Sequence, residues 1–238
     1  FFYNLKLCLN YIMLPSSMNY FKKMDAIGRN QKLRLNAQPT NGSTFTSGSS
    51  TIEITIPCSQ PGLFADLKNG YFSAVIENKD GTNAHTLYGK VGSLGLIKKV
   101  RCETSTNTKF SEVENWNVLA GIKLAESVDE NYMTGQGRAM FGVSNVFAGD
   151  SMASGAKVEP VFPFLLNGLA GESLTPLCGR ENIKLHFEIE SALTASIGVV
   201  ATAVAADLQL SSVQFFYDAY RLEDAEYKSL LEDVSGVF

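Results

Sequence analysis

Histidine is scarce in this chain, which contains only His85 and His186 among its 238 residues. A metal centre built on histidines therefore has few ligands, and the clustered His-x-His with a carboxylate that a cupin-type oxygenase requires is absent. His186 alternates with Lys184 and Glu188, so we interpret it as a solvated surface histidine and neither a ligand nor a base. His85 lies beside a predicted hairpin turn and receives the same interpretation.

Cysteine is sparse as well, and its four copies are far apart: Cys8, Cys58, Cys102 and Cys178. No two of them form a C-x-x-C pair, so the sequence indicates neither a zinc site nor a dense disulfide framework. We therefore expect free, buried thiols in a reducing compartment.

Excess positive charge and long apolar runs are both missing. The 20 Lys and Arg residues are outnumbered by 24 Asp and Glu residues. This argues against a nucleic-acid binder that depends on phosphate contacts, although a local basic patch remains open. The apolar start, Phe1 to Leu14, has no preceding basic region and no small-residue cleavage site, so we interpret it as an arm and not a signal peptide. The run Ala192 to Ala206 is too short and too rich in Ala, Thr and Gly to span a bilayer of about 30 Å, and we predict no transmembrane segment.

Alternation of apolar and polar residues is what the sequence does contain, most clearly from Ile183 to Glu190. A period of two predicts a strand that buries one face and leaves Lys184, His186, Glu188 and Glu190 in water, as in an antiparallel sheet over a core. Further predicted strands lie at 32–35, 51–56, 71–77, 84–91, 94–103, 158–167 and 208–222. The last of these has a predicted bulge near Ser211 and Ser212.

Turn and helix signals complete the pattern. Lys79 to Thr82 contains the Asp-Gly of a tight hairpin leading into the strand at 84–91. Ser111 and Glu114 have the spacing of a capping box, which predicts a helix near 112–126 with Trp116 as a core anchor. Residues 131–157 form a long predicted contact loop, and Asp224 could cap a short final helix.

These features predict an all-β protein, an antiparallel β sandwich of jelly-roll type with one or two short helices. The predicted organisation is an N-terminal arm at 1–30, a jelly-roll domain at 31–222 and a C-terminal helix or linker at 223–238. No catalytic, cofactor-binding or metal-binding residue is predicted, and no cofactor. Glu188 and Glu190 share a predicted strand face, but a solvated charged face explains them better than a pair of glycosidase carboxylates. We therefore expect that the chain is not an enzyme.

The order of several segments resembles the double-jelly-roll major capsid proteins of polinton-like viruses, virophages and tectivirus-like phages. The first part of the resemblance is Ile54 to Pro57, Phe64 to Phe72 and Lys79 to Gly81, followed by Leu94 to Val100 and Val113 to Leu119. The second part is Phe162 to Gly171, Leu174 to Leu177, Ile183 to Glu190 and Leu208 to Leu222. Those proteins carry two jelly rolls in tandem, whereas this chain holds one, so it is either part of a longer chain or a single-roll relative.

The resemblance implies a structural capsid protein that self-assembles through loop and arm contacts into an icosahedral virion shell. Its partners would be other copies of itself, in a trimeric capsomer, and other capsid proteins, with no sequence-specific nucleic acid. Phe1 to Met24 would run under or between subunits, and contact with an internal membrane is the alternative for this arm. The rival hypothesis is a jelly-roll binding module that recognises a glycan or receptor through its loops.

Overall fold

The computed structural model describes residues 31–46, 51–82, 85–87, 92–127, 129, 135, 150–163, 174–177, 181–190, 199–200, 208–223 and 227. The predicted arm at 1–30, most of the final helix and most of the two long loops at 131–157 and 192–206 lie outside these residues. Cys8 and Cys178 lie outside them as well. The division into arm, domain and linker therefore stays a prediction.

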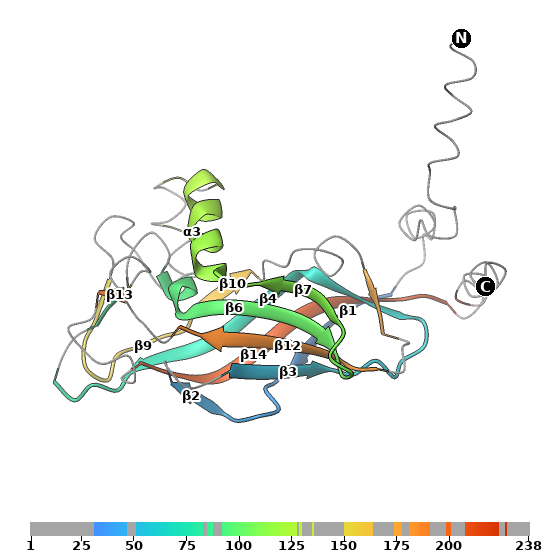
Figure 1. Ribbon diagram of the computed structural model, residues 1–238, viewed down its shortest axis with the longest axis horizontal. Coiled ribbons are helices and arrows are strands. Elements are labelled where there is room, and N and C mark those ends of the chain that lie inside the picture. The colour runs from blue at the N-terminus through green and yellow to red at the C-terminus, as the bar shows by residue number, and fades with distance from the viewer. Residues whose placement is uncertain are drawn as a thin grey trace, which may run out of the picture.

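Two antiparallel sheets form the two layers of a sandwich (Figure 1). The larger sheet has the order β1 (Gln31–Ala37), β14 (Leu208–Arg221), β4 (Leu63–Asn78) and β10 (Val161–Pro163). Short strands extend it: β2 (Thr44–Thr46) beside β14, and β9 (Lys157–Val158) and β11 (Thr175–Pro176) beside β4. The smaller sheet has the order β3 (Thr51–Ile56), β12 (Ile183–Ile189), β6 (Ile97–Thr104) and β7 (Lys109–Val113).

The remaining elements lie outside this sandwich. A third, small sheet has the order β13 (Val199–Val200), β5 (His85–Leu87) and β8 (Asp150–Met152). A 3-10 helix, η2 (Gly92–Leu96), precedes β6, and α3 (Trp116–Ser127) follows β7. Figure 1 shows α3 projecting away from the two layers.

The strand order follows one rule when β9 and β10 are counted as one strand interrupted at Glu159 and Pro160. The eight principal strands in chain order are then β1, β3, β4, β6, β7, β9/β10, β12 and β14. They pair from the outside inward: β1 with β14, β3 with β12, β4 with β9/β10, and β6 with β7. The chain is thus a long antiparallel hairpin wound into two sheets, which is a jelly roll. The predicted fold class is confirmed.

Strict alternation explains why β3 and its neighbour β12 both turn one face toward the core. Ile52, Ile54 and Ile56 are fully buried, while the Thr and Glu residues between them face outward. Phe187 of β12 meets Phe72 of β4 with ring centroids 4.9 Å apart, which joins the two sheets. Such β-branched and aromatic side chains suit a pleated surface that is buried on one side.

The predicted bulge in the last strand is confirmed. Ser211 pairs with Val75 and Gln214 with Ser73, so Ser212 and Val213 together oppose one residue of β4. Ser212 has φ 51°, in the left-handed region that a bulge of this kind requires. A second irregularity, between Asp66 and Tyr71, sits opposite Tyr217, and the Asp66 carboxylate there accepts hydrogen bonds from the backbone and side-chain nitrogens of Asn69.

Three local predictions are corrected. The turn at 79–82 does not fold the next strand onto β4, because β5 pairs with β8 and β13 in the third sheet. Ser111 belongs to β7 and caps nothing, so the helix is real but begins at Trp116. Between the predicted strands at 32–35 and 51–56, the structure has a further strand, β2.

Side-chain burial largely follows the predicted pattern. Trp116 is buried, as expected of a core anchor, and the described cysteines, Cys58 and Cys102, are buried as well. Burial raises the pKa of the Cys102 thiol to about 12. Phe215 and Tyr217 are buried, whereas Phe216 between them lies on the outer face of the sheet. In the part of the chain that is described, no helix is long and apolar enough to cross a membrane.

Candidate functional site

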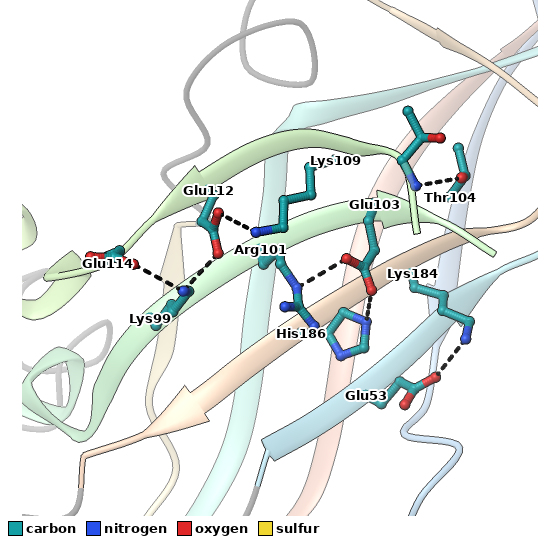
Figure 2. Close-up of polar contacts among 11 residues, drawn as sticks. Glu53, Lys99, Arg101, Glu103, Thr104, Lys109, Glu112, Glu114, Lys184 and His186 are labelled. Carbon is teal, nitrogen blue, oxygen red and sulfur yellow. Dashed lines mark hydrogen bonds and ion pairs between the residues drawn. The ribbon is translucent and has the colours of Figure 1, made fainter. Parts of the chain in front are cut away.

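The outer face of the four-stranded sheet carries the largest group of interacting charged side chains among the ion pairs of the described residues. We call it the ionic face. Its members are Glu53 of β3, Lys184, His186 and Glu188 of β12, Lys98, Lys99, Arg101 and Glu103 of β6, Lys109 and Glu112 of β7, and Glu114 just after β7. Figure 2 shows most of these side chains along the surface of the sheet, linked by ion pairs.

Antiparallel register sets the order of the charges. One row across the four strands reads Glu53, His186, Arg101, Glu112, and the next reads Thr55, Lys184, Glu103, Lys109. Opposite charges thus meet between strands and between rows. Cross-strand pairs of opposite charge stabilise a sheet, and here each strand forms at least one such pair with its neighbour.

The centre of the ionic face is the pair formed by His186 and Glu103. The His186 Nε2 atom lies 3.0 Å from Glu103 Oε1, and Arg101 Nε lies 3.1 Å from Glu103 Oε2. The two side chains of the pair are only 12% and 5% exposed. The interpretation of His186 as a solvated surface histidine is therefore wrong, because its neighbours on the sheet cover it.

The surroundings of His186 favour its neutral form. Burial is the main cause that lowers the pKa of His186, and the positive charge of Arg101 adds to the effect, while Glu103 opposes it. A neutral imidazole beside a carboxylate can hold its orientation without adding a third cation between Arg101 and Lys184.

The β7 edge of the ionic face holds a second cluster of charges. Lys99 Nζ lies 2.6 Å from Glu112 and 3.2 Å from Glu114, and Lys109 Nζ lies 2.7 Å from Glu112. Hydrogen bonds from Lys109 and Lys99 lower the pKa of Glu112 to about 2. This carboxylate therefore stays charged and holds both lysines in place at any physiological pH.

A histidine beside a carboxylate also has the geometry of a general base, and a substrate would have to reach it from a hollow in the surface. Two hollows lined by described residues lie elsewhere. One, of 690 Å³, is lined by Ser59, Gln60 and Arg221, and the other, of 500 Å³, by Gln38, Thr44 and Ser212. Neither includes His186 or Glu103. Within the described ranges, no group of three or more His, Cys, Asp or Glu side chains is arranged to hold a metal ion.

The two carboxylates that follow His186 have different environments. Glu188 remains on the ionic face, 46% exposed and 3.8 Å from Lys98. Glu190 lies beyond the end of β12 and is buried, where its Oε2 atom accepts a hydrogen bond of 3.3 Å from Asn117 Nδ2. The prediction that both carboxylates lie on one solvated face is therefore wrong for Glu190.

This buried hydrogen bond fixes the base of α3. Trp116 and Ala120 are buried on the inner side of the helix, while Val118 and Ile122 are each 52% exposed. The helix is thus anchored to the sandwich at its first turn and displays apolar side chains on another side.

The alternating sequence indicates His186 but not its partner. Glu103 lies in a predicted strand, yet its contact with His186 depends on the register between β6 and β12, which are about eighty residues apart. Asn117 gave no signal beyond a position in a predicted helix. His85 lies in β5.

Comparison with known proteins gives a likeness of fold. No protein-family model and no curated protein sequence matches the chain. Among solved structures, VP54 of PBCV-1, fitted into a reconstruction of the virophage Sputnik, is similar with a TM-score of 0.51 and 14% identity, over 85% of this chain and 45% of that one. The Faustovirus major capsid protein has a TM-score of 0.49 at 11% identity, over 94% of this chain and 58% of that one. The STIV MCP has a TM-score of 0.47 at 19% identity, over 85% and 51%.

The chain therefore has the fold of one jelly roll from a double-jelly-roll major capsid protein, as its sequence pattern predicted. It spans about half the length of the structures that it matches. At these identities the likeness establishes the fold, and the function has to be argued separately.

Proposed function

We propose that this chain is a structural capsid protein, a jelly roll that assembles with copies of itself and with other capsid proteins into an icosahedral virion shell. The single observation that carries the proposal is the match of 85% of the chain to VP54 of PBCV-1, over 45% of that protein. A share of this size is what one of two tandem rolls would occupy.

The character of the ionic face supports a structural role. Its charged side chains are used in pairs with one another, and its histidine is held between Glu103 and Arg101. Charged side chains that are paired across neighbouring strands stabilise the sheet. The proposal therefore assigns no enzymatic activity and no cofactor.

The proposed partners are copies of the same chain in a trimeric capsomer. The long loop at 131–157 and the arm at 1–30 would supply contacts between subunits, and the virion is the proposed location. Contact of the apolar arm with an internal membrane is the less favoured role for that segment. No observation on the described residues favours recognition of a glycan or a receptor.

Mass spectrometry of purified virions, combined with electron cryomicroscopy of the shell, tests the proposal. We expect peptides of this chain at a copy number typical of a shell protein, and density for a jelly roll in which the β3–β12–β6–β7 sheet can be traced. Virions whose shell contains no such peptides and no such density would refute it. The intact mass of the native polypeptide separates a single roll of 25.9 kDa from a tandem protein of about twice that mass.

Flotation with liposomes tests the arm separately. The intact chain should float no better than a chain that lacks residues 1–24 if the arm packs against neighbouring subunits. Flotation of the intact chain alone would assign the arm to the membrane.

A further inference from the structure

The outer face of the seven-stranded sheet differs in kind from the ionic face. Two neighbouring rows in its middle contain no charged residue, and we call them the uncharged belt. The belt consists of Asn36, Phe216 and Tyr71 in one row and Gln214, Ser73 and Val161 in the next. The rings of Tyr71 and Phe216 stack at 4.9 Å with both side chains half-buried, and Val161 is 37% exposed.

Charged residues lie on both sides of the belt, and they are paired. On one side Arg34 Nε and Lys32 Nζ lie 2.9 Å and 2.8 Å from the buried carboxylate of Asp218. The guanidinium of Arg34 also lies 5.4 Å from the centre of the Tyr71 ring, which holds it against the belt.

The other side of the belt repeats this arrangement. Lys79 Nζ and Lys157 Nζ lie 2.8 Å and 3.6 Å from Glu77. The face therefore has an uncharged, aromatic centre between two charged rims. Protein–protein interfaces have this composition, because charged residues are depleted from their cores while Tyr, Phe and Arg are enriched.

The charges argue against a nucleic acid as the occupant. Each pair of cations on this face is already bound to a carboxylate, and the chain as a whole has a net charge of -4. A phosphate backbone would need an excess of free cations along the sheet. A protein partner with a surface of mixed charge does not need free cations.

The extent of the face suits a stable protein contact. β4 and β14 are 16 and 14 residues long. At about 3.3 Å per residue and about 4.8 Å between strands, the seven strands of this sheet together cover on the order of 700 Å². A standard interface buries about 800 Å² on each partner.

We propose that the uncharged belt is the centre of a contact between this domain and a second copy of the same chain. The inference rests on the proposed assembly function and goes further by naming the face that makes the contact. Each rim has two cations on one carboxylate, which leaves a single positive charge per rim and only weak repulsion between two copies. Tyr71 and Phe216 form the ordered centre of the contact, and Arg34 lies at its rim.

Sedimentation velocity of the whole chain over a concentration series tests this assignment. The variants are Val161→Arg and Asn36→Glu, which place a charge at two exposed positions of the belt on different strands. The matched control is Thr51→Arg, at an exposed strand position on the outer side of the other sheet. Circular dichroism and thermal unfolding of each variant report whether the fold is retained.

We expect the wild-type chain to self-associate, each belt variant to weaken the association at least tenfold, and Thr51→Arg to change it less than twofold. A wild-type chain that stays monomeric at high concentration overturns the inference. So does a folded belt variant that associates like the wild type. If the shell of the virion contains the chain but the belt variants associate normally, only the assignment of the face fails. If the shell lacks the chain, the proposed function fails, and sedimentation still decides the self-contact.

Discussion

Asn78 is the residue whose replacement gives the sharpest test of this structure. It ends β4, is fully buried, and connects that strand to the loop between β8 and β9. Its Nδ2 atom donates to the carbonyl oxygens of Met152 at 3.0 Å and Ala153 at 3.3 Å. Its Oδ1 atom accepts a hydrogen bond of 3.0 Å from the backbone nitrogen of Asp80.

Asn78→Ala removes three hydrogen bonds and leaves their partners behind. Each bond contributes about 0.5–1.5 kcal/mol net, and a buried group left without a partner costs about 1–3 kcal/mol. Met152 is buried, so its carbonyl has little access to water, whereas Ala153 is exposed and its carbonyl can be hydrated. We therefore expect the free energy of unfolding to fall by about 2–4 kcal/mol.

Urea unfolding at constant pH measures this loss, and hydrogen exchange locates it. The backbone N–H of Gly155 donates to the carbonyl of Asn78 at 2.9 Å, so exchange at Gly155 should accelerate more than exchange in β12. Thr51→Ala, at an exposed position of β3, is the control and should change stability by less than about 0.5 kcal/mol. A loss below about 1 kcal/mol for Asn78→Ala, with unchanged exchange at Gly155, would refute the reasoning.

Three further predictions concern packing, backbone conformation and protonation. Gly70→Ala should destabilise the fold by about 1–3 kcal/mol in a thermal melt, because its Cβ would lie 2.5 Å from the Phe215 ring; unchanged stability would contradict this packing. Asn107 has φ 67°, so Asn107→Gly should leave the melting temperature unchanged or higher, whereas Asn107→Ala should lower stability by roughly 1 kcal/mol; equal effects would contradict the backbone assignment. For His186, a lowered pKa in the folded state means that the unfolded chain binds the proton first. Its contribution to stability is complete above the unfolded pKa of about 6.5 and is lost as pH falls through the lowered folded value. Urea unfolding from pH 7.5 to 5.5 should therefore show the wild type losing stability relative to His186→Gln, and a relative gain would mean that the ion pair with Glu103 dominates.

Strands with strict alternation could be predicted from the sequence alone. β3 matches its predicted range, β12 ends one residue short, and the bulge in β14 lies where the register of the last strand slips. In each case the period of two reflects a local requirement, because a strand over a core must bury every second residue. The jelly-roll class followed from the number and spacing of such strands.

Features set by distant contacts could not be predicted in this way. The first half of β4 was missed because the irregularity after Asp66 interrupts its alternation. The Asp-Gly turn predicted a hairpin, but a turn signal does not specify which sheet the next strand joins. The spacing of Ser111 and Glu114 imitates a helix cap inside β7, where pairing with β6 outweighs local propensity.

The charged surface likewise combines features that local alternation predicts with features that depend on distant contacts. Alternation placed Lys184, His186 and Glu188 on an outer face, and that placement is confirmed. The burial of His186 and Glu190 depends on Glu103 and Asn117, which come from other elements. A single sequence contains no information on register between strands that are far apart.

The pairing of the first strand with the last has a consequence for the order of events during synthesis. Gln31 pairs with Arg221, and β14 contacts β1, β2 and β4, so the larger sheet has no centre until the final strand leaves the ribosome. Such non-local pairing makes folding slow, and we expect β6 and β7 to pair first because one short turn joins them. The uncharged belt draws its residues from β1, β4, β10 and β14, so it comes into existence only when both ends of the domain have paired. An incomplete or misfolded copy therefore lacks the proposed contact surface, and the topology itself would act as a checkpoint that admits only finished domains to assembly.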